Sequence, residues 1–371
     1  MFSLIKSNNS PIGLDISDIS LRMMQFGAGQ NGLKSVLAYT DIAVPKQAVV
    51  DDVVKNPRIL TAIIREGFKK PTFGKFAGNL VVASIPETKS FVRVIDMPLM
   101  SESEAREAVP WEAEQYVPMP IGQVYLDWVI LKQSADQENR RMKVFLNASP
   151  RDFVDDQVGY MKEAGLQPVA LEVESQATAR SLIPSDRGPG AYLILDINAI
   201  RSSFIVYDEG TLQFTSSIPI AGNSFTDAIA KVMNVPFEKA EQIKRKIGLE
   251  KEAESGMLRK ALLPVLNNLV SEIRKTLKFF EEQSGGSDKI KALILTGGSG
   301  KLKDLPSYLS RSLRSSERSA EHKLKSFPGL EVELGNPWQN ILSKKQTPPL
   351  SRTDSLSFST AIGLALRELE E

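Results

Sequence analysis

The sequence has no cysteine and a single histidine, His322. Without cysteine there are no disulfides, no thiolate metal sites and no thiol catalysis. With one histidine, a zinc enzyme or a histidine-based catalytic triad is strongly disfavoured. We expect His322 to be a solvated surface residue, because the surrounding residues 315–325 are polar.

Long apolar runs are also missing, and so is an excess of either charge. No stretch approaches the length that spans a bilayer, and Met1–Lys6 lacks the core of a signal peptide, which predicts a cytoplasmic protein. Lys and Arg number 46 against 45 Asp and Glu, so no net field favours nucleic acid. The 371 residues, 42% of them hydrophobic, predict a folded protein of two or three domains.

What the sequence does contain is one pattern, D-I-x-x-I, written twice, at 15–19 and at 196–200. Each copy follows an apolar run and precedes alternating strand-like residues, so each predicts a hairpin turn in a three-strand meander. Two such units facing one another would form a cleft with Asp15 on one wall and Asp196 on the other. Turn amides cradle anions, and a neighbouring carboxylate can hold hydrated Mg²⁺. One copy alone would indicate only a capped turn, but the pair predicts a nucleotide triphosphate site.

A glycine turn adds a third wall. The predicted strand 292–295 runs into T-G-G-S-G at 296–300. Glycines at the carboxyl end of a strand let a flat ligand approach the backbone closely.

The segment 91–164 predicts a compact α/β unit with a hairpin tip at 133–140. Ser101 and Glu104 fit a capping box at the start of its first helix. The run P-W-E-A-E-Q-Y-V-P-M-P at 110–120 has two interpretations: a helix end with Trp111 and Tyr116 packed inward, or an interaction surface. Further helices are predicted at 51–69, 171–182, 225–233, 238–247, 258–283 and 355–369, with a linker at 184–190 and a mobile polar segment at 310–325.

Together these motifs resemble the actin-like ATPase superfamily, whose fold places two lobes around a nucleotide cleft. The resemblance implies two phosphate turns, an adenosine turn and two connecting helices at 173–181 and 359–365. It also implies that Glu241 and Lys244 face the ribose and base. The implied cofactors are ATP and Mg²⁺, with the metal held through water by Asp15 and Asp196. The implied nucleotide-binding residues are Asp15, Ser17, Ser20, Asp196, Asn198, Arg201, Gly222, Glu241, Lys244, Gly297, Gly298 and Ser299.

Within that superfamily the chain most resembles the PilM family of type IV pilus assembly proteins, which is related to FtsA. The run at 110–120, the opening Ser3-Leu4-Ile5 before 13–16, the segment 218–224 and the helix segment 271–280 carry this resemblance. It implies an FtsA-like inserted subdomain at 87–168. The first lobe would be 1–86, completed by 169–187 and 351–371, and the second lobe 188–350 with a helical subdomain at 226–284.

Three positions depart from the superfamily pattern. Ser17-Asp18-Ile19 replaces small residues and would bring a second carboxylate near the phosphates, where it would weaken binding unless it points outward or joins the Mg²⁺ shell. Asn198 stands where glycine is usual, and asparagine tolerates left-handed geometry. Glu174-Ser175 replaces Glu-Pro. Only Glu174 is suited to orient water, so we expect hydrolysis to be slow or absent.

Three functions compete. The first is an ATP-binding adaptor of the type IV pilus platform, recruited to the inner membrane by the tail of a PilN-like protein. The second is an FtsA-like polymerising protein, although the acidic end 366–371 lacks the membrane helix usual in FtsA. The third is a sugar-kinase-type phosphotransferase, which is disfavoured because 371 residues leave little room for an added substrate-binding region. The type II secretion platform shares the fold, and self-association is a further property that the resemblance implies.

Overall fold

The structure is a computed structural model that describes residues 10–28, 34–133, 141–184, 190–208, 210–249, 255–283, 289–315, 326–342 and 347–367. Several predictions fall wholly or partly outside these residues. They concern His322, the hairpin tip at 133–140, the linker at 184–190, the polar segment at 310–325, the opening residues 3–5 and the acidic end.

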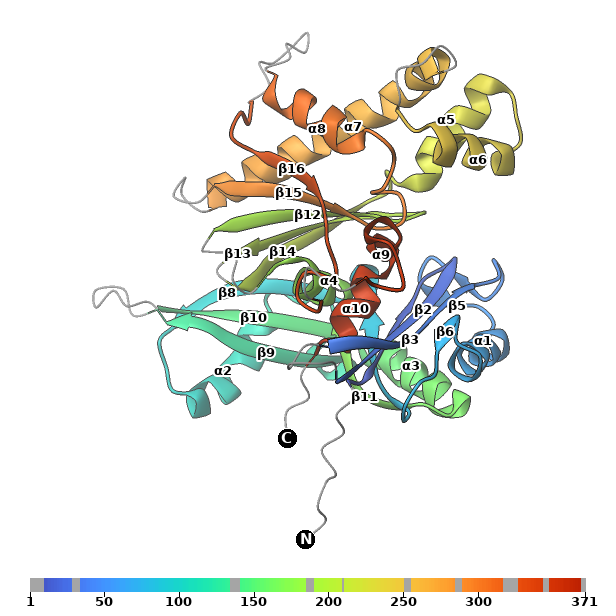
Figure 1. Ribbon diagram of the computed structural model, residues 1–371. Helices are drawn as coiled ribbons and strands as arrows, with labels where there is room; N and C mark the ends of the chain where they lie inside the picture. Colours follow the sequence, from blue (N-terminus) through green and yellow to red (C-terminus); the bar gives the residue numbers. More distant parts are fainter. Residues whose placement is uncertain are drawn as a thin grey trace.

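The first lobe is built on a six-stranded sheet (Figure 1). Two helices, α1 (Pro57–Lys69) and α3 (Arg151–Ala164), cover the face that carries Ile12 and Leu14. Helix α10 (Ser359–Ala365) covers the opposite face. In spatial order the strands are β11 (Gln167–Val173), β7 (Leu80–Ile85), β1 (Ile12–Ile16), β2 (Ser20–Ala28), β3 (Lys34–Ala43) and β6 (Phe73–Gly74).

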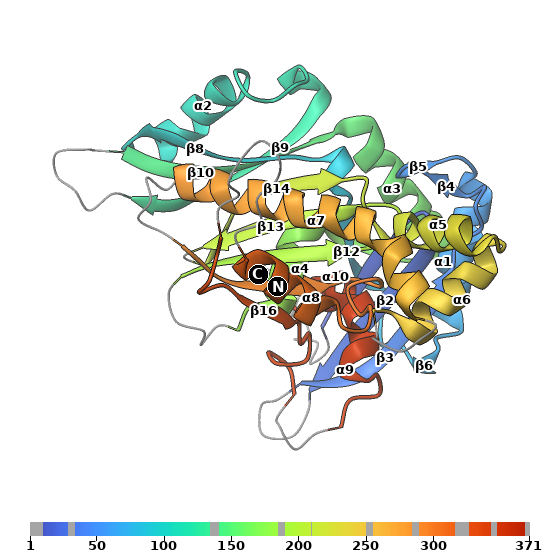
Figure 2. The ribbon, with the colours of Figure 1, turned by 90° about the horizontal axis from the view of Figure 1, so that it is seen from above.

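The second lobe is built on a five-stranded sheet. Its strands in spatial order are β14 (Thr211–Ile218), β13 (Ser202–Asp208), β12 (Ala191–Ile197), β15 (Ile290–Thr296) and β16 (Glu331–Leu334). Helices α7 (Ser255–Gln283) and α8 (Leu305–Arg314) pack on one face of this sheet, and α7 crosses above its strands (Figure 2). Helices α5 (Gly222–Met233) and α6 (Phe237–Ile247) extend the lobe at one end.

A third sheet contains β8 (Phe91–Pro98), β10 (Arg141–Pro150) and β9 (Val124–Gln133), all antiparallel. Helix α2 (Glu102–Ala113) packs on it, and the predicted capping box of Ser101 and Glu104 is present. Helix α3, which the sequence analysis placed in the insertion, packs with α1 in the core of the first sheet. The domain boundaries stay a prediction.

Two predicted helices were wrong in part, and one strand was missed. The helix expected at 51–69 starts only at Pro57, because Asn56 caps it and proline suits the first helical position. Residues 49–54 instead form a hairpin of β4 (Val49–Val50) and β5 (Val53–Val54). The helix expected at 171–182 is α4 (Glu174–Leu182), since the preceding residues pair with β7 as β11. Strand β16 was not predicted.

The inward packing predicted for Trp111 was also wrong, because its side chain is 73% exposed. Trp111 lies within α2, whose buried face carries Ala105, Val109 and Ala113 at a spacing of four residues, so position 111 falls on the opposite face of the helix. Tyr116 is partly buried against the third sheet, with the Arg93 guanidinium 4.5 Å from its ring centroid. The aromatic run is therefore split between a packed tyrosine and an exposed tryptophan.

Candidate functional site

The first D-I-x-x-I copy forms the turn between β1 and β2. Ser17 N–H donates to the Ser20 carbonyl at 2.9 Å, and the hydroxyls of Ser17 and Ser20 lie 3.0 Å apart. Both serine side chains therefore serve to close the turn. Asp15 stands just before it on β1, and its Oδ1 accepts from the Ser84 hydroxyl of β7 at 3.0 Å.

Asp18, the additional carboxylate expected to weaken phosphate binding, forms hydrogen bonds with a different part of the chain. Its carboxylate accepts the backbone N–H groups of Asp51 at 3.2 Å and Asp52 at 3.0 Å, at the tip of the β4–β5 hairpin. Both residues have positive φ, 52° and 58°, as a two-residue hairpin turn of the mirror-image type requires. Asp18 thus joins the first turn to a second hairpin and is not aimed as an unpaired charge at the turn amides.

The second copy forms the matching turn between β12 and β13. Asn198 N–H donates to the Arg201 carbonyl at 3.1 Å, and the Asn198 carbonyl accepts from Gly222 N–H at 2.8 Å, which ties the turn to the start of α5. Asn198 is not among the described residues with positive φ, so its tolerance of left-handed geometry is not used. Arg201 reaches across to the first lobe, where its guanidinium lies 3.7 Å from the Asp51 carboxylate.

The glycine turn lies directly against the second turn. Gly297 has φ of 82°, and a Cβ added there would fall 2.2 Å from Asp196 Oδ1. Ser299 N–H donates to the Ile197 carbonyl at 2.8 Å, and a Cβ on Gly222 would meet the Ser299 hydroxyl. Gly298 has more room, since its nearest neighbour is the Ser357 hydroxyl at 3.7 Å. Asp196, Gly222, Gly297 and Ser299 therefore form one compact group.

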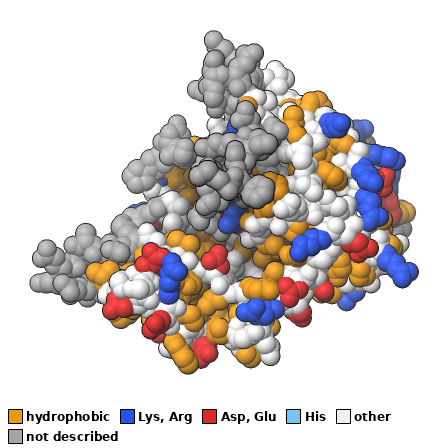
Figure 3. Space-filling view, turned by 90° about the horizontal axis from the view of Figure 1, so that it is seen from below, with side chains coloured by type: hydrophobic (Ala, Val, Ile, Leu, Met, Phe, Trp, Pro, Cys, Tyr) orange, Lys and Arg blue, Asp and Glu red, His pale blue; other side chains and the backbone are white. Residues whose placement is uncertain are grey.

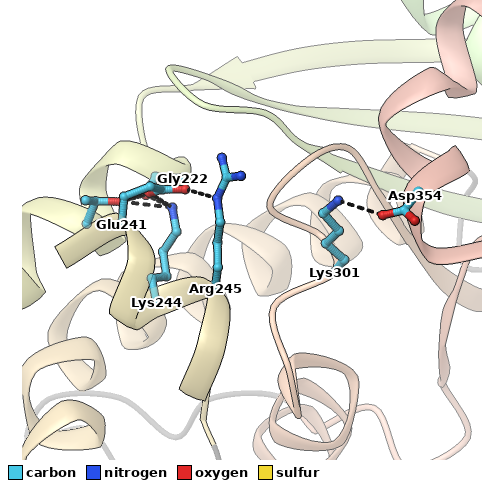
Figure 4. A network of polar contacts seen from close by, with 7 residues as sticks. Gly222, Glu241, Lys244, Arg245, Lys301 and Asp354 are labelled. Carbon is cyan, nitrogen blue, oxygen red and sulfur yellow. Dashed lines mark hydrogen bonds and ion pairs between the residues drawn. The ribbon is translucent and has the colours of Figure 1, made fainter. Parts of the chain in front are cut away.

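Helix α6 brings Glu241 and Lys244 together next to that group (Figure 4). Lys244 Nζ lies 2.7 Å from Glu241 and donates to the Gly222 carbonyl and the Thr226 hydroxyl, both at 2.9 Å. Burial alone would raise the pKa of Glu241, but hydrogen bonds from Lys244, Thr226 and Arg245 lower it to about 2. Glu241 is therefore charged at neutral pH, and its partner Lys244 fixes α6 to the first residue of α5.

Acidic side chains gather between the two turns. Burial raises the pKa of Asp15, and it raises the pKa of Asp196 to about 7, with the charge of Asp15 adding to the effect. The pKa of Glu174, the first residue of α4, is raised well above its ordinary value by burial and then by the charges of Asp15, Asp52, Glu87 and Asp196. The two predicted metal-binding aspartates and Glu174 thus lie within electrostatic range of one another.

This cluster fits a divalent cation that arrives with its own ligands. In the described parts of the chain no three acidic or histidine side chains are grouped closely enough to hold a metal by themselves. Mg²⁺ characteristically keeps several waters and binds through one or two carboxylates together with phosphate oxygens. A pair of aspartates with raised pKa values meets that requirement, because a cation would offset their mutual repulsion.

The two predicted connecting helices, α4 and α10, pack against each other between the lobes. The Thr178 and Thr360 hydroxyls are 3.0 Å apart, and Arg180 donates both to the Gly363 carbonyl and to the buried Glu172. The approach is close, since a Cβ on Gly363 would fall 1.7 Å from the Ala177 carbonyl oxygen. Leu182 and Ala179 continue into the core beneath the second sheet. Both lobes therefore rest on α4.

Two meander sheets with matching turns, a glycine turn and a crossed helix pair define the actin-like ATPase fold. MreB5 of Spiroplasma citri bound to AMPPNP has this fold, with a TM-score of 0.52 at 14% identity over 96% of this chain and 95% of that one. The family model described as type IV pilus assembly protein PilM matches residues 13–369. The chain therefore belongs to the PilM family of type IV pilus assembly proteins.

Further relatives agree with this membership. The solved PilM-PilN type IV pilus biogenesis complex contains a chain 27% identical to this one, with a TM-score of 0.77 over 96% of this chain and 98% of that chain. Cell division protein FtsA of Buchnera aphidicola is 26% identical over 214 residues, and FtsA of Pseudomonas aeruginosa is 28% identical over 160. The chain spans about half or less of the length of these curated relatives, 47% and 38%. No helix in the described residues is both long and apolar enough to cross a membrane.

Several residues around the site were missed by the sequence analysis. Glu87 follows the end of β7, and its Oε1 accepts Ser175 N–H at 3.1 Å while its Oε2 accepts from the Thr215 hydroxyl at 2.7 Å. Because β7 and β11 are parallel neighbours, polar residues after both ends meet at one edge. The parallel pairing of β7 and β11 therefore predicts that Glu87 lies next to the start of α4. No local sequence pattern indicates that Thr226 or Asp51 lies at the site.

The raised pKa of Asp196 predicts a pH-dependent stability. Between pH 4 and about 7 the folded protein keeps a proton that the unfolded chain has released, so the free energy of unfolding should fall as pH rises through this window, by a few kcal/mol at most. Asp15 and Glu174 act in the same direction. Urea unfolding at pH 5.5 and 8 should show the loss, and Asp196→Asn should reduce it. An equal loss in wild type and variant would contradict the assignment.

Proposed function

We propose that the protein is an ATP-binding adaptor of the type IV pilus inner-membrane assembly platform that binds the cytoplasmic tail of a PilN-like membrane protein. The likeness to the PilM-PilN complex over 96% of the chain is the observation that carries this proposal. The duplicated turns around an acidic pair support the nucleotide part, and family membership supports the pilus part.

In this proposal each turn contributes backbone amides at its tip, 18–19 and 199–200, to the triphosphate. Asp15 and Asp196 hold Mg²⁺ through water, and the metal neutralises charge between the phosphates and the carboxylates. Gly297, Gly298 and Ser299 receive the adenosine, with Gly222 and the Glu241–Lys244 pair beside them. Binding residues from both lobes would draw the lobes onto one ligand.

Hydrolysis is expected to be slow or absent. Glu174 is the one acidic residue in the first turn of α4, and burial together with the charges of Asp15, Asp52, Glu87 and Asp196 raises its pKa well above the ordinary value, which favours its protonated form. A protonated carboxyl is a poor acceptor for a proton from water. Its role would be to position the ligand and not to activate water.

The partner tail would bind on the first lobe or the inserted sheet. Seen from below, the face toward which α2, α3 and β11 lie carries apolar side chains among charged ones (Figure 3). Leu99, Trp111 and Val129 of the inserted segment are exposed. A flexible tail binding to such a surface orders on contact, so we expect an affinity on the order of micromolar.

Membrane recruitment tests the adaptor role. We expect the protein to sediment with the inner membrane only in cells that contain the PilN-like protein, because its anchor would come from that partner. The matched control is a PilN-like protein that keeps its membrane span but lacks its cytoplasmic tail, which should leave the adaptor in the soluble fraction. Membrane association that persists after the partner gene is deleted would overturn the proposal.

A further inference from the structure

The tip of the β4–β5 hairpin, Asp51 and Asp52, contacts three parts of the molecule at once. The Asp18 carboxylate of the first turn accepts both tip amides. Arg201 of the second turn lies 3.7 Å from the Asp51 carboxylate. The Thr88 hydroxyl donates to Asp52 Oδ2 at 2.6 Å. Two lobes and a third segment therefore meet on two residues.

The third segment leads into the inserted sheet. Thr88 lies in the short 3-10 helix η2 (Glu87–Lys89), and β8 begins two residues after it. Glu87 in the same helix accepts hydrogen bonds from Ser175 N–H of α4 and from Thr215 of β14. A movement of η2 would thus be felt by the inserted sheet, by α4 and by the second lobe.

The contacts differ in strength, and the difference shows which one gives way first. Arg201 is 40% exposed and Asp51 70%, and exposed ion pairs at such distances contribute little to stability. The carboxylates of Asp18 and Asp52 accept charge-assisted hydrogen bonds, two of them at Asp18 and a short one at Asp52, and such bonds are roughly twice as strong as neutral ones. The hairpin tip therefore stays attached to the first turn and to η2 while Arg201 can leave.

We infer that Arg201 is a switch that exchanges the Asp51 carboxylate for an anionic ligand held between the two turns, and that the hairpin tip relays this exchange through Thr88 to the inserted sheet. The inference rests on the proposed nucleotide binding. A polyphosphate carries several charges where Asp51 carries one, so it competes successfully for the guanidinium. The ligand would contact Arg201 in one state and not in the other, in which Arg201 pairs with Asp51. A ligand can shift an equilibrium between two states only if its contacts differ between them.

The switch is tested by nucleotide affinity. Asp51→Asn tolerates the positive φ and removes the competing carboxylate, so it should tighten binding of Mg²⁺-AMPPNP about two- to fivefold in calorimetric titration. The control Glu102→Gln breaks an exposed ion pair of α2 with the same loss of charge, and should leave the affinity unchanged. Unchanged or weaker binding by Asp51→Asn would overturn the switch.

The relay is tested by hydrogen exchange at residues 87–98, first without any ligand. Asp18→Ser frees the hairpin tip and should raise exchange there at least twofold, an effect absent from Glu102→Gln. With Mg²⁺-AMPPNP, exchange at 87–98 should change in wild type and in Thr88→Ser, which keeps the hydroxyl, but not in Thr88→Val. Hydrogen exchange at residues 17–28 should change on addition of Mg²⁺-AMPPNP in wild type, in Thr88→Ser and in Thr88→Val.

The outcomes separate the two proposals. Exchange at 87–98 that ignores Asp18→Ser, or that responds to nucleotide in Thr88→Val as in wild type, would overturn the relay even if nucleotide binds. Failure of every variant and of wild type to bind Mg²⁺-AMPPNP would overturn the proposed function and the switch with it, while the ligand-free experiment would still decide whether the relay exists.

Discussion

Replacing Gly363 with alanine is expected to destabilise the protein by about 3 kcal/mol or more, a large share of the 5–15 kcal/mol that holds a typical domain together. The new Cβ would fall 1.7 Å from the carbonyl oxygen and 2.4 Å from the carbonyl carbon of Ala177. Both are backbone atoms of α4 and cannot rotate away, so α4 and α10 would have to separate. Urea unfolding followed by circular dichroism measures the loss.

The matched control is Gly159→Ala in α3. No atom lies within 4 Å of a Cβ at that position. Alanine is the better helix former, so this variant should gain about 0.5–1 kcal/mol. The two substitutions add the same methyl group to a helix and should act in opposite directions. Equal stability of the two variants would show that α4 and α10 are not in close contact.

Replacing Gly297 with alanine is expected to weaken Mg²⁺-ATP binding at least tenfold, approaching the loss expected for Asp196→Ala. Its Cβ would lie 2.2 Å from Asp196 Oδ1 and 2.6 Å from the Ile197 carbonyl oxygen, at a φ that alanine rarely adopts. The aspartate that would hold the metal's water shell must then move. Calorimetric titration, with stability checked by thermal unfolding, measures the effect.

Gly298→Ala is the informative companion to that substitution. Its Cβ finds only the Ser357 hydroxyl at 3.7 Å, an ordinary contact, so the protein itself accommodates it. Lost affinity in this variant with unchanged stability would place the ligand in that space. Wild-type affinity in both Gly297→Ala and Asp196→Ala would refute the nucleotide site.

The parts of the fold and site that could be predicted from sequence were those with local patterns. Asp15 and Asp196 each follow an apolar strand and precede a short polar turn, and both turns formed as expected. The capping box of Ser101 formed because its two partners are three residues apart. Repetition within one chain also gave the fold, since two similar meanders indicate two similar lobes.

The parts that could not be predicted depend on distant partners. Nothing near Asp18 indicates that its carboxylate turns toward amides more than thirty residues away. Residues 167–173 form too short a run for apolar spacing to separate a strand from a helix, and their pairing with β7 makes them a strand. The exposure of Trp111 follows from which face of α2 packs on the third sheet, and the tryptophan itself does not determine that face. Asn56 and Pro57 do carry a local signal for the observed start of α1, since asparagine caps helices and proline suits the first helical position.

The packing of α10 on the first sheet has a consequence for how the chain folds during synthesis. Gly13 on β1 faces the backbone of Ala361 and Ala365, so this face of β1 is covered only after α10, far along the chain, has been synthesised. Such a contact joins residues that are far apart in sequence and forms late. The second lobe draws its core from a continuous stretch and can assemble first. A nascent chain would therefore expose this face of the first sheet to chaperones until α10 has been made.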